Sequence, residues 1–208
     1  MCNVDYRRPV EALIPGVHGR VLGVLARTES EMTIRTVARL AAASPQQASV
    51  VVAHLGDLGV VSRRDAGSSA LVRLERNNAT AQLVLALARL QDLVMDRLSE
   101  SARGITPAPA SLLVFGSFAR GEATDTSDLD VLAVRPEHLE ADASEWVDAL
   151  GSWQANAQKI VGNQVNLLVV SIEEVPALLR RRGGPWRTIA REGIPLVGPT
   201  LPALHPVA

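Results

Sequence analysis

The sequence SLLVFGSFARGEATDTSDLDVLAV, residues 111–134, decides how the second half of this chain folds. It opens on an apolar run at 111–115 that is typical of a buried strand, and it ends on another at 131–134. Gly116 follows the first run directly, and a residue without a Cβ lets the backbone approach a phosphate closely. Ser117 adds a hydroxyl and an amide at the start of an expected helix. Together the two residues predict an anion site.

Two acidic residues stand at the start of the second strand. Asp128 and Asp130 are two positions apart, and side chains at that spacing on a strand project from the same face. Two carboxylates placed so close together predict a cation between them, and hard oxygen ligands favour Mg²⁺, with Mn²⁺ as the alternative. A phosphate site ten residues before such a pair is what nucleotidyl transfer from a nucleoside triphosphate requires.

The stretch resembles the nucleotidyltransferase superfamily that includes DNA polymerase beta, and most closely its minimal nucleotidyltransferase branch. The shared pattern is Gly-Ser, ten residues, then Asp-x-Asp, and the resemblance covers about residues 108–198. It implies that Gly116 and Ser117 hold the triphosphate and that Asp128 and Asp130 bind the metal ion that bridges it. Arg120 would neutralise phosphate charge, or would be a surface arginine with no such role.

The sequence departs from the family pattern at the third acidic position. A helix expected at about 144–161 precedes a strand at 164–170, and Asn166 stands where the family places a third carboxylate. An amide brings no charge and cannot take a proton, so its presence should weaken a second metal and slow the chemistry. Glu173 and Glu174 lie just after this strand. They are either substitutes for the missing acid or residues that stabilise the start of a helix.

The tail of the chain is basic. Arg180, Arg181 and Arg182 precede a short apolar segment, an ending that is usual in minimal nucleotidyltransferases. These arginines would contact an acidic acceptor or nucleic acid, or they would simply lie at a solvated helix end.

The first half of the chain predicts short helices followed by a β-hairpin. Helices are expected at 17–28, at about 36–43 and at 45–58, the last with Ser44 and Gln47 as a capping box. Strands at 60–64 and 70–75 follow, joined by a turn-rich loop at 65–69. This order resembles small bacterial winged-helix regulators over about residues 10–77.

The winged-helix resemblance implies contact with duplex DNA. Helix 45–58 would enter the major groove, and the hairpin would meet phosphates or the minor groove. The residues offered to base edges are Gln46, Gln47, Ser49 and His54, and those offered by the hairpin are Arg63, Arg64 and Arg73. The alternative is a winged domain retained only for dimerisation or protein docking.

A single long helix is expected to link the two halves. Leu83, Leu87, Leu90, Val94 and Leu98 recur at steps of three and four over residues 78–102, and Gly104–Pro109 follows as a linker. The apolar stripe would pack within the chain, or it would form the seam of a homodimer. The expected fold class is therefore α+β: a winged helix-turn-helix domain at 10–77, a linking helix at 78–103, and an α/β nucleotidyltransferase domain with a mixed sheet at 108–198.

Composition narrows the class of protein. The 208 residues carry a formal net charge of −1, which excludes a polycation. The charge is uneven, because residues 1–105 hold 13 arginines against 10 acidic residues, and residues 106–208 hold 8 basic against 12 acidic residues. Cys2 is the single cysteine, so the sequence predicts no disulfide framework and no cysteine zinc site. With no signal peptide or transmembrane run, we expect a cytoplasmic protein without a membrane partner.

Two functions remain open from the sequence. The first is an enzyme that transfers a nucleoside monophosphate from a nucleoside triphosphate to a hydroxyl acceptor. The second, motivated by Asn166, is a DNA-binding transcription regulator whose second domain senses a nucleotide with little or no turnover.

Overall fold

The computed structural model describes residues 4–67, 69–181 and 183–204. Cys2, Ser68, Arg182 and His205 lie outside these ranges. Contacts divide the chain into two compact units. The N-terminal unit is Arg8–Leu90, and the C-terminal unit is Gln91–Ala208 together with the first seven residues.

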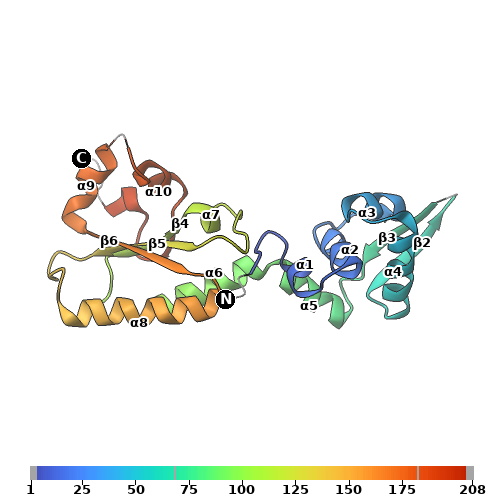
Figure 1. The fold of residues 1–208 in the computed structure, drawn as a ribbon, viewed down its shortest axis with the longest axis horizontal. Helices are drawn as coiled ribbons and strands as arrows, with labels where there is room; N and C mark the ends of the chain where they lie inside the picture. The colour runs from blue at the N-terminus through green and yellow to red at the C-terminus, as the bar shows by residue number, and fades with distance from the viewer. Residues whose placement is uncertain (1–3, 68, 182, 205–208) are drawn as a thin grey trace. The chain divides into compact units, whose positions relative to one another are not determined.

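The N-terminal unit packs helices against a small antiparallel sheet of order β1-β3-β2 (Figure 1). Its core consists of valine, leucine and alanine side chains from each of its helices and from both hairpin strands, and Val21, Leu25, Val37 and Val72 are fully buried. Its elements are α1 (Pro9–Leu13), α2 (Val17–Ala26), β1 (Met32–Thr33), α3 (Ile34–Leu40), α4 (Pro45–Asp57), β2 (Val61–Ala66), β3 (Ser69–Leu74) and α5 (Ala79–Ala88). From α2 to β3 the order agrees with the order that the sequence predicts, and α1 is an addition.

The start of α4 is fixed by the expected capping box. The hydroxyl of Ser44 accepts a hydrogen bond from the backbone N–H of Gln47, and the Gln47 side chain accepts one from the backbone N–H of Ser44. Pro45 occupies the first turn, where its missing N–H costs nothing. The cap therefore sets where the exposed face of α4 begins.

Replacing Ser44 with alanine should lower the free energy of unfolding by about 1 kcal/mol, because one N–H at the start of α4 loses its partner. In a unit of this size that loss corresponds to a melting temperature lower by about 4–8 °C. Denaturation followed by circular dichroism measures it. Ser49→Ala is the control, since Ser49 is exposed on the same helix and its hydroxyl makes no hydrogen bond within the described residues. Equal stability of the two variants would contradict the role of the cap.

The prediction of a single linking helix at 78–103 is wrong. The segment forms two helices, α5 and α6 (Leu90–Ala102), because Arg89 leaves the helical conformation at φ −106° and ψ 26°. Ala81, Val84 and Leu85 of α5 are buried in the N-terminal unit, whereas Leu83 is 71% exposed. The predicted apolar stripe therefore does not continue as one face.

The C-terminal unit contains a four-stranded mixed sheet of order β6-β5-β4-β7. Strand β4 (Ser111–Phe115) is antiparallel to both β5 (Leu129–Arg135) and β7 (Ile194–Val197), and β6 (Val165–Ser171) is parallel to β5. The remaining elements are α6, α7 (Gly116–Ala119), α8 (Ser144–Val161), η1 (Ile172–Glu174), α9 (Val175–Arg180), α10 (Trp186–Glu192) and η2 (Leu201–Leu204). The mixed sheet agrees with the predicted fold class of this half.

Helices cover both faces of this sheet. Figure 1 shows α8 along one face and α9 and α10 on the other. Trp146 and Trp153 are the large buried side chains of α8, while α9 and α10 bury Leu178, Trp186 and Ile189 over Leu113, Leu132 and Val134 of the central strands. Because side chains alternate along a strand, even-numbered positions of β5 face α9 and α10.

Within the described residues, every helix is too short or too polar to cross a lipid bilayer.

Candidate functional site

The register of β5 and β6 brings three sequence-predicted residues together. Asp130 pairs with Asn166 across the two parallel strands, and Asp128 stands two positions before Asp130. By alternation, Asp130 and its register partner Asn166 lie on the sheet face that carries α9 and α10. Asp128 and Asn166 are exposed and Asp130 is half-buried, so the group is open to solvent.

One amide joins the two carboxylates. Nδ2 of Asn166 donates a hydrogen bond to Oδ2 of Asp128 over 3.2 Å and another to Oδ1 of Asp130 over 3.3 Å. Both carboxylates therefore point toward one position in space. Among residues 4–67, 69–181 and 183–204, no cluster of three or more His, Cys, Asp or Glu side chains could hold a metal ion. Asn166, which stands where the family pattern places a third acid, thus contacts both Asp128 and Asp130 through its amide.

The glycine turn lies directly against this pair. Gly116 follows β4 with φ at +73°, a conformation that other residues rarely adopt. A Cβ added there would lie 2.8 Å from Oδ2 of Asp130, a distance too short for a real contact. Ser117 is the second residue of the short helix α7, and the fully buried ring of Phe118 anchors that helix. The structure therefore brings the predicted phosphate turn and the predicted metal ligands to one place.

Tyr6 and Arg7 of the N-terminal segment support α7. The sequence did not predict this contact. The ring of Tyr6 packs on Phe118 with centroids 4.8 Å apart, and its hydroxyl donates to the carbonyl of Val161 at the end of α8. The backbone N–H groups of Tyr6 and Arg7 both donate to the carbonyl of Ala123. No spacing in the sequence reveals this contact. The only available signal is a tyrosine in a chain with 3% aromatic residues.

Burial raises the pKa of Tyr6 to about 12. The group is neutral when protonated, and its pKa in the unfolded chain is about 10. Above pH 10 the unfolded chain therefore binds fewer protons than the folded protein. The contribution of Tyr6 to the free energy of unfolding is fully present below pH 10 and is lost as the pH rises toward 12. Tyr6 is the chain's single tyrosine, so absorbance at 295 nm follows it alone. We expect a midpoint near pH 12 in the folded protein, moving to about 10 in urea; a midpoint of 10 in both would contradict this packing.

The loop that leads into Asp128 is held by a buried asparagine. Nδ2 of Asn163 donates to the carbonyls of Ser127 and Thr124, over 2.8 and 3.3 Å, and its Oδ1 accepts from the backbone N–H of Val4. The hydroxyl of Ser127 in turn accepts from the backbone N–H of Thr124. Asn163 is 1% exposed and was not predicted from the sequence. It fixes the backbone immediately before the first aspartate.

Arg120 is committed to ion pairs. Its Nε lies 2.8 Å from Glu122 and its NH1 lies 3.4 Å from Glu192, which belongs to α10. The bond to Glu122 is the main cause that raises the pKa of Arg120, and hydrogen bonds from Arg191 and then Arg120 lower the pKa of Glu192. A role on phosphate would require Arg120 to leave these partners. In the structure it is an exposed, ion-paired arginine.

Glu173 and Glu174 lie in the first turn of η1, and Glu174 completes a capping box with Ser171. The carboxylate of Glu174 accepts from the backbone N–H of Ser171 over 2.7 Å, and a hydrogen bond with the Ser171 side chain lowers the pKa of Glu173. Asn166 and Ser171 are five residues apart on β6, which corresponds to about 16 Å. Neither glutamate can replace the missing carboxylate from that end of the strand.

The residues predicted to contact DNA are all exposed, but the hairpin arginines have partners. The exposed residues of α4 that were predicted to contact DNA are Gln46, Gln47, Ser49 and His54. Arg64 lies 2.6 Å from Glu31, Arg63 lies 3.7 Å from Asp65, and Nε of Arg73 donates to the hydroxyl of Ser62. The ring of His54 meets that of His18 edge to face, with centroids 5.8 Å apart. The surface formed by these residues of α4 and the hairpin is therefore accessible, and its positive charge is partly neutralised by the acidic partners.

Comparison with known proteins gives evidence for the C-terminal half. The search of curated proteins found no match. Among solved structures, a proposed nucleotidyltransferase from Sulfolobus solfataricus is similar at 19% identity and a TM-score of 0.31, over 51% of this chain and 82% of that one. A similarity this low establishes neither fold nor activity. Residues 95–182, which include Gly116, Asp128, Asp130 and Asn166, match the model of the nucleotidyltransferase domain family, and this match supports nucleotidyl transfer as the general function of that part of the chain.

Proposed function

We propose that the C-terminal unit binds a nucleoside triphosphate with a divalent cation and transfers its nucleoside monophosphate to a hydroxyl acceptor. The observation that carries the proposal is the Asn166 amide within hydrogen-bond distance of both Asp128 and Asp130, beside the positive-φ Gly116. The family match over 95–182 gives the proposal its reaction class.

The residues present fit one hard cation. Two carboxylates converge on a single position, and Asn166 can present its carbonyl oxygen there when its amide turns over. Oxygen donors of this kind suit Mg²⁺ or Mn²⁺. When bound, the cation would neutralise charge on the triphosphate. The ligands would be Asp128 and Asp130, and nothing in the donor set offers a third charge for a second cation.

The protein's own residues would mainly bind and orient. The Gly116 turn would let backbone approach the triphosphate, and Ser117 would offer its hydroxyl and amide to the phosphate oxygens. The acceptor oxygen bonds to the α-phosphorus, the bond from that phosphorus to the bridging oxygen breaks, and pyrophosphate leaves. Asn166 cannot take the acceptor's proton, which therefore passes to solvent. We expect slow transfer for this reason.

Incubation with α-³²P-labelled nucleoside triphosphates tests the proposal. The full chain is mixed with Mg²⁺ or Mn²⁺ and with candidate acceptors, namely the chain itself, RNA ends and small polyols. The expected result is label transfer that stops in Asp128→Ala and continues in Asp125→Ala, whose carboxylate is exposed in the loop before the site. Transfer that survives Asp128→Ala would contradict the assignment.

A second candidate is a nucleotide-sensing regulator that binds DNA through residues 10–77 read as a winged helix. Two observations favour it: the amide at the third acidic position, and the capped helix α4 whose polar residues are exposed before a hairpin. Tight cation-dependent nucleotide binding with no transfer would distinguish the sensor from the enzyme. On this reading two copies of the chain would meet the two halves of a DNA site.

Salt dependence tests the DNA part. Binding to duplex DNA should weaken as salt rises, with a shallow slope, because Arg63 and Arg64 already have acidic partners. Glu31→Gln should strengthen binding, since it frees the guanidinium of Arg64. A slope near zero, or no effect of Glu31→Gln, would remove the DNA proposal and leave the nucleotide site untouched.

A further inference from the structure

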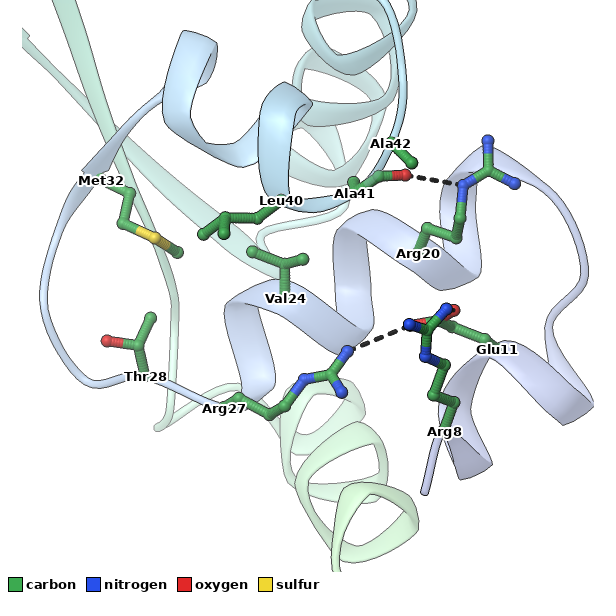
Figure 2. A pocket seen from close by; sticks show the side chains of 10 residues that line it. All are labelled: Arg8, Glu11, Arg20, Val24, Arg27, Thr28, Met32, Leu40, Ala41 and Ala42. Carbon is green, nitrogen blue, oxygen red and sulfur yellow. Dashed lines mark hydrogen bonds and ion pairs between the residues drawn. The ribbon is translucent and has the colours of Figure 1, made fainter. Parts of the chain in front are cut away.

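The N-terminal unit contains a pocket that the proposed function does not use. Its volume is about 410 Å³, within the range of small-molecule sites. The lining comes from the start of α1, from α2 and the segment after it, from β1, and from the end of α3 with the turn that follows it. It consists of Arg8, Glu11, Arg20, Val24, Arg27, Thr28, Met32, Leu40, Ala41 and Ala42 (Figure 2). All of these residues belong to one unit.

The lining divides into an apolar part and a charged part. Figure 2 shows Met32, Leu40 and Val24 together, with the guanidinium groups of Arg8, Arg20 and Arg27 displaced toward the other side. Leu40 is 51% exposed, so an apolar side chain at the rim is left uncovered by the protein. Burying such a surface under an apolar ligand is favourable.

The charged part has more positive than negative groups. Glu11 is the one acidic residue among the described residues of the lining, and it lies 3.0 Å from Arg27 and 3.6 Å from Arg8. Arg27 also donates to the carbonyl of Gly23 through Nε. With Glu11 matched to Arg27, the positive charge of Arg20 has no acidic partner within the described residues.

Arg20 is held in position while its terminal nitrogens stay free. Its Nε donates to the carbonyl of Ala41 over 2.7 Å, and that bond anchors the stem of the guanidinium at the turn before α4. Its two terminal nitrogens make no hydrogen bond within the part of the chain that the structure describes. An arginine fixed in this way presents N–H groups to a carboxylate at little cost in entropy.

We propose that this pocket binds a small amphipathic monocarboxylate, with its carboxylate on Arg20 and its apolar chain over Val24, Met32 and Leu40. The pocket is independent of the nucleotide site, so the proposal stands whether or not nucleotidyl transfer is found. The ligand would also touch Ala41 and Ala42, the turn from which α4 begins, and Ala42 has φ at +47°, a strained value for a residue with a Cβ. Occupancy would therefore act on the segment that orients α4.

The test uses octanoate as the probe and the methyl group of Met32 as the reporter. The full chain is labelled with methyl-¹³C methionine, and Met32→Leu identifies the resonance. We expect a saturable shift of the Met32 signal with octanoate. Acetate, which lacks the chain, 1-octanol, which lacks the charge, and inorganic phosphate should each bind at least about 10-fold more weakly, because each makes only part of the contacts.

Variants distinguish octanoate binding in the pocket from a general attraction of octanoate to the positive charges of the unit. Arg20→Gln should weaken octanoate binding about 10-fold, the usual loss for a hydrogen bond to a charged group. Arg39→Gln, an exposed arginine of α3 outside the lining, should leave it unchanged. If Arg20→Gln does not fold, Leu40→Gln tests the apolar part, since Leu40 is half exposed and does not carry the core. The proposal is overturned by an absent or unsaturable shift, by equal effects of Arg20→Gln and Arg39→Gln, or by phosphate binding as tightly as octanoate.

Discussion

Asn166→Asp should raise nucleotidyl transfer by about 10²-fold or more, because a positioned general base contributes 10²–10⁴-fold to such reactions. The parent side chain contacts both Asp128 and Asp130 through its amide, so an aspartate would stand at the same place on β6. It would add the third charge for the cation and an oxygen that can take the acceptor's proton. The measurement is the rate of label transfer from nucleoside triphosphate at saturating Mg²⁺ or Mn²⁺.

The same variant has a readout that does not depend on activity. Three carboxylates without a cation repel one another, so Asn166→Asp should melt at a lower temperature than the parent protein in EDTA. Added Mn²⁺ should raise its melting temperature more than that of the parent, because a ligand that binds the folded state stabilises it. Asn156→Asp, the same chemical change at an exposed position of α8, is the control. A variant that gains neither rate nor cation-dependent stability would show that the site lacks more than one acid.

Gly116→Ala should lower transfer by about 10²-fold or more and should destabilise the C-terminal unit by about 1–3 kcal/mol. Two causes act together. The backbone at φ +73° is strained for a residue with a Cβ, and that Cβ would lie 2.8 Å from Oδ2 of Asp130. Relief of the clash must move either the turn that would hold phosphate or the carboxylate that would hold the cation. Steady-state transfer rates and urea denaturation measure the two effects.

Gly151→Ala is the matched control for this change. Gly151 lies in the middle of α8 and is exposed, and apart from its own neighbours and helix backbone no described residue has a heavy atom within 4 Å of an added Cβ. Alanine there should stabilise the helix by up to about 1 kcal/mol and leave transfer unchanged. If Gly116→Ala kept full activity, the turn could not be the phosphate site.

Local signals in the sequence were enough to place the elements that carry the site. The predicted strand at 111–115 and the helix at 144–161 have the bounds that the structure shows. Apolar runs of strand length, bounded by glycine or polar residues, mark a buried sheet, and the alternation of side chains then fixes which acids share a face. The capping box at Ser44 was likewise predictable, because each of its hydrogen bonds joins residues three apart.

Contacts between residues distant in sequence could not be predicted. Tyr6 and Val161 are 155 residues apart, and Asn163 and Val4 are 159 apart, so no local pattern links them. The helix break at Arg89 could not be predicted for a related reason. Apolar residues recur at spacings of three and four on both sides of Arg89, but α5 and α6 pack into different units. Asn166 itself was placed by alternation, but its contact with both aspartates depends on the register of β6 against β5.

Nucleotide binding measured with and without cation tests the central claim most directly. Equilibrium dialysis of the full chain against a labelled, non-hydrolysable nucleoside triphosphate analogue is compared in Mn²⁺ and in EDTA, for the parent protein and for the double variant Asp128→Asn, Asp130→Asn. We predict binding by the parent in Mn²⁺ that falls at least about 10-fold in EDTA and equally in the double variant, because both changes remove the charge that holds the triphosphate. Binding of equal strength under all four conditions would contradict the account for enzyme and sensor alike.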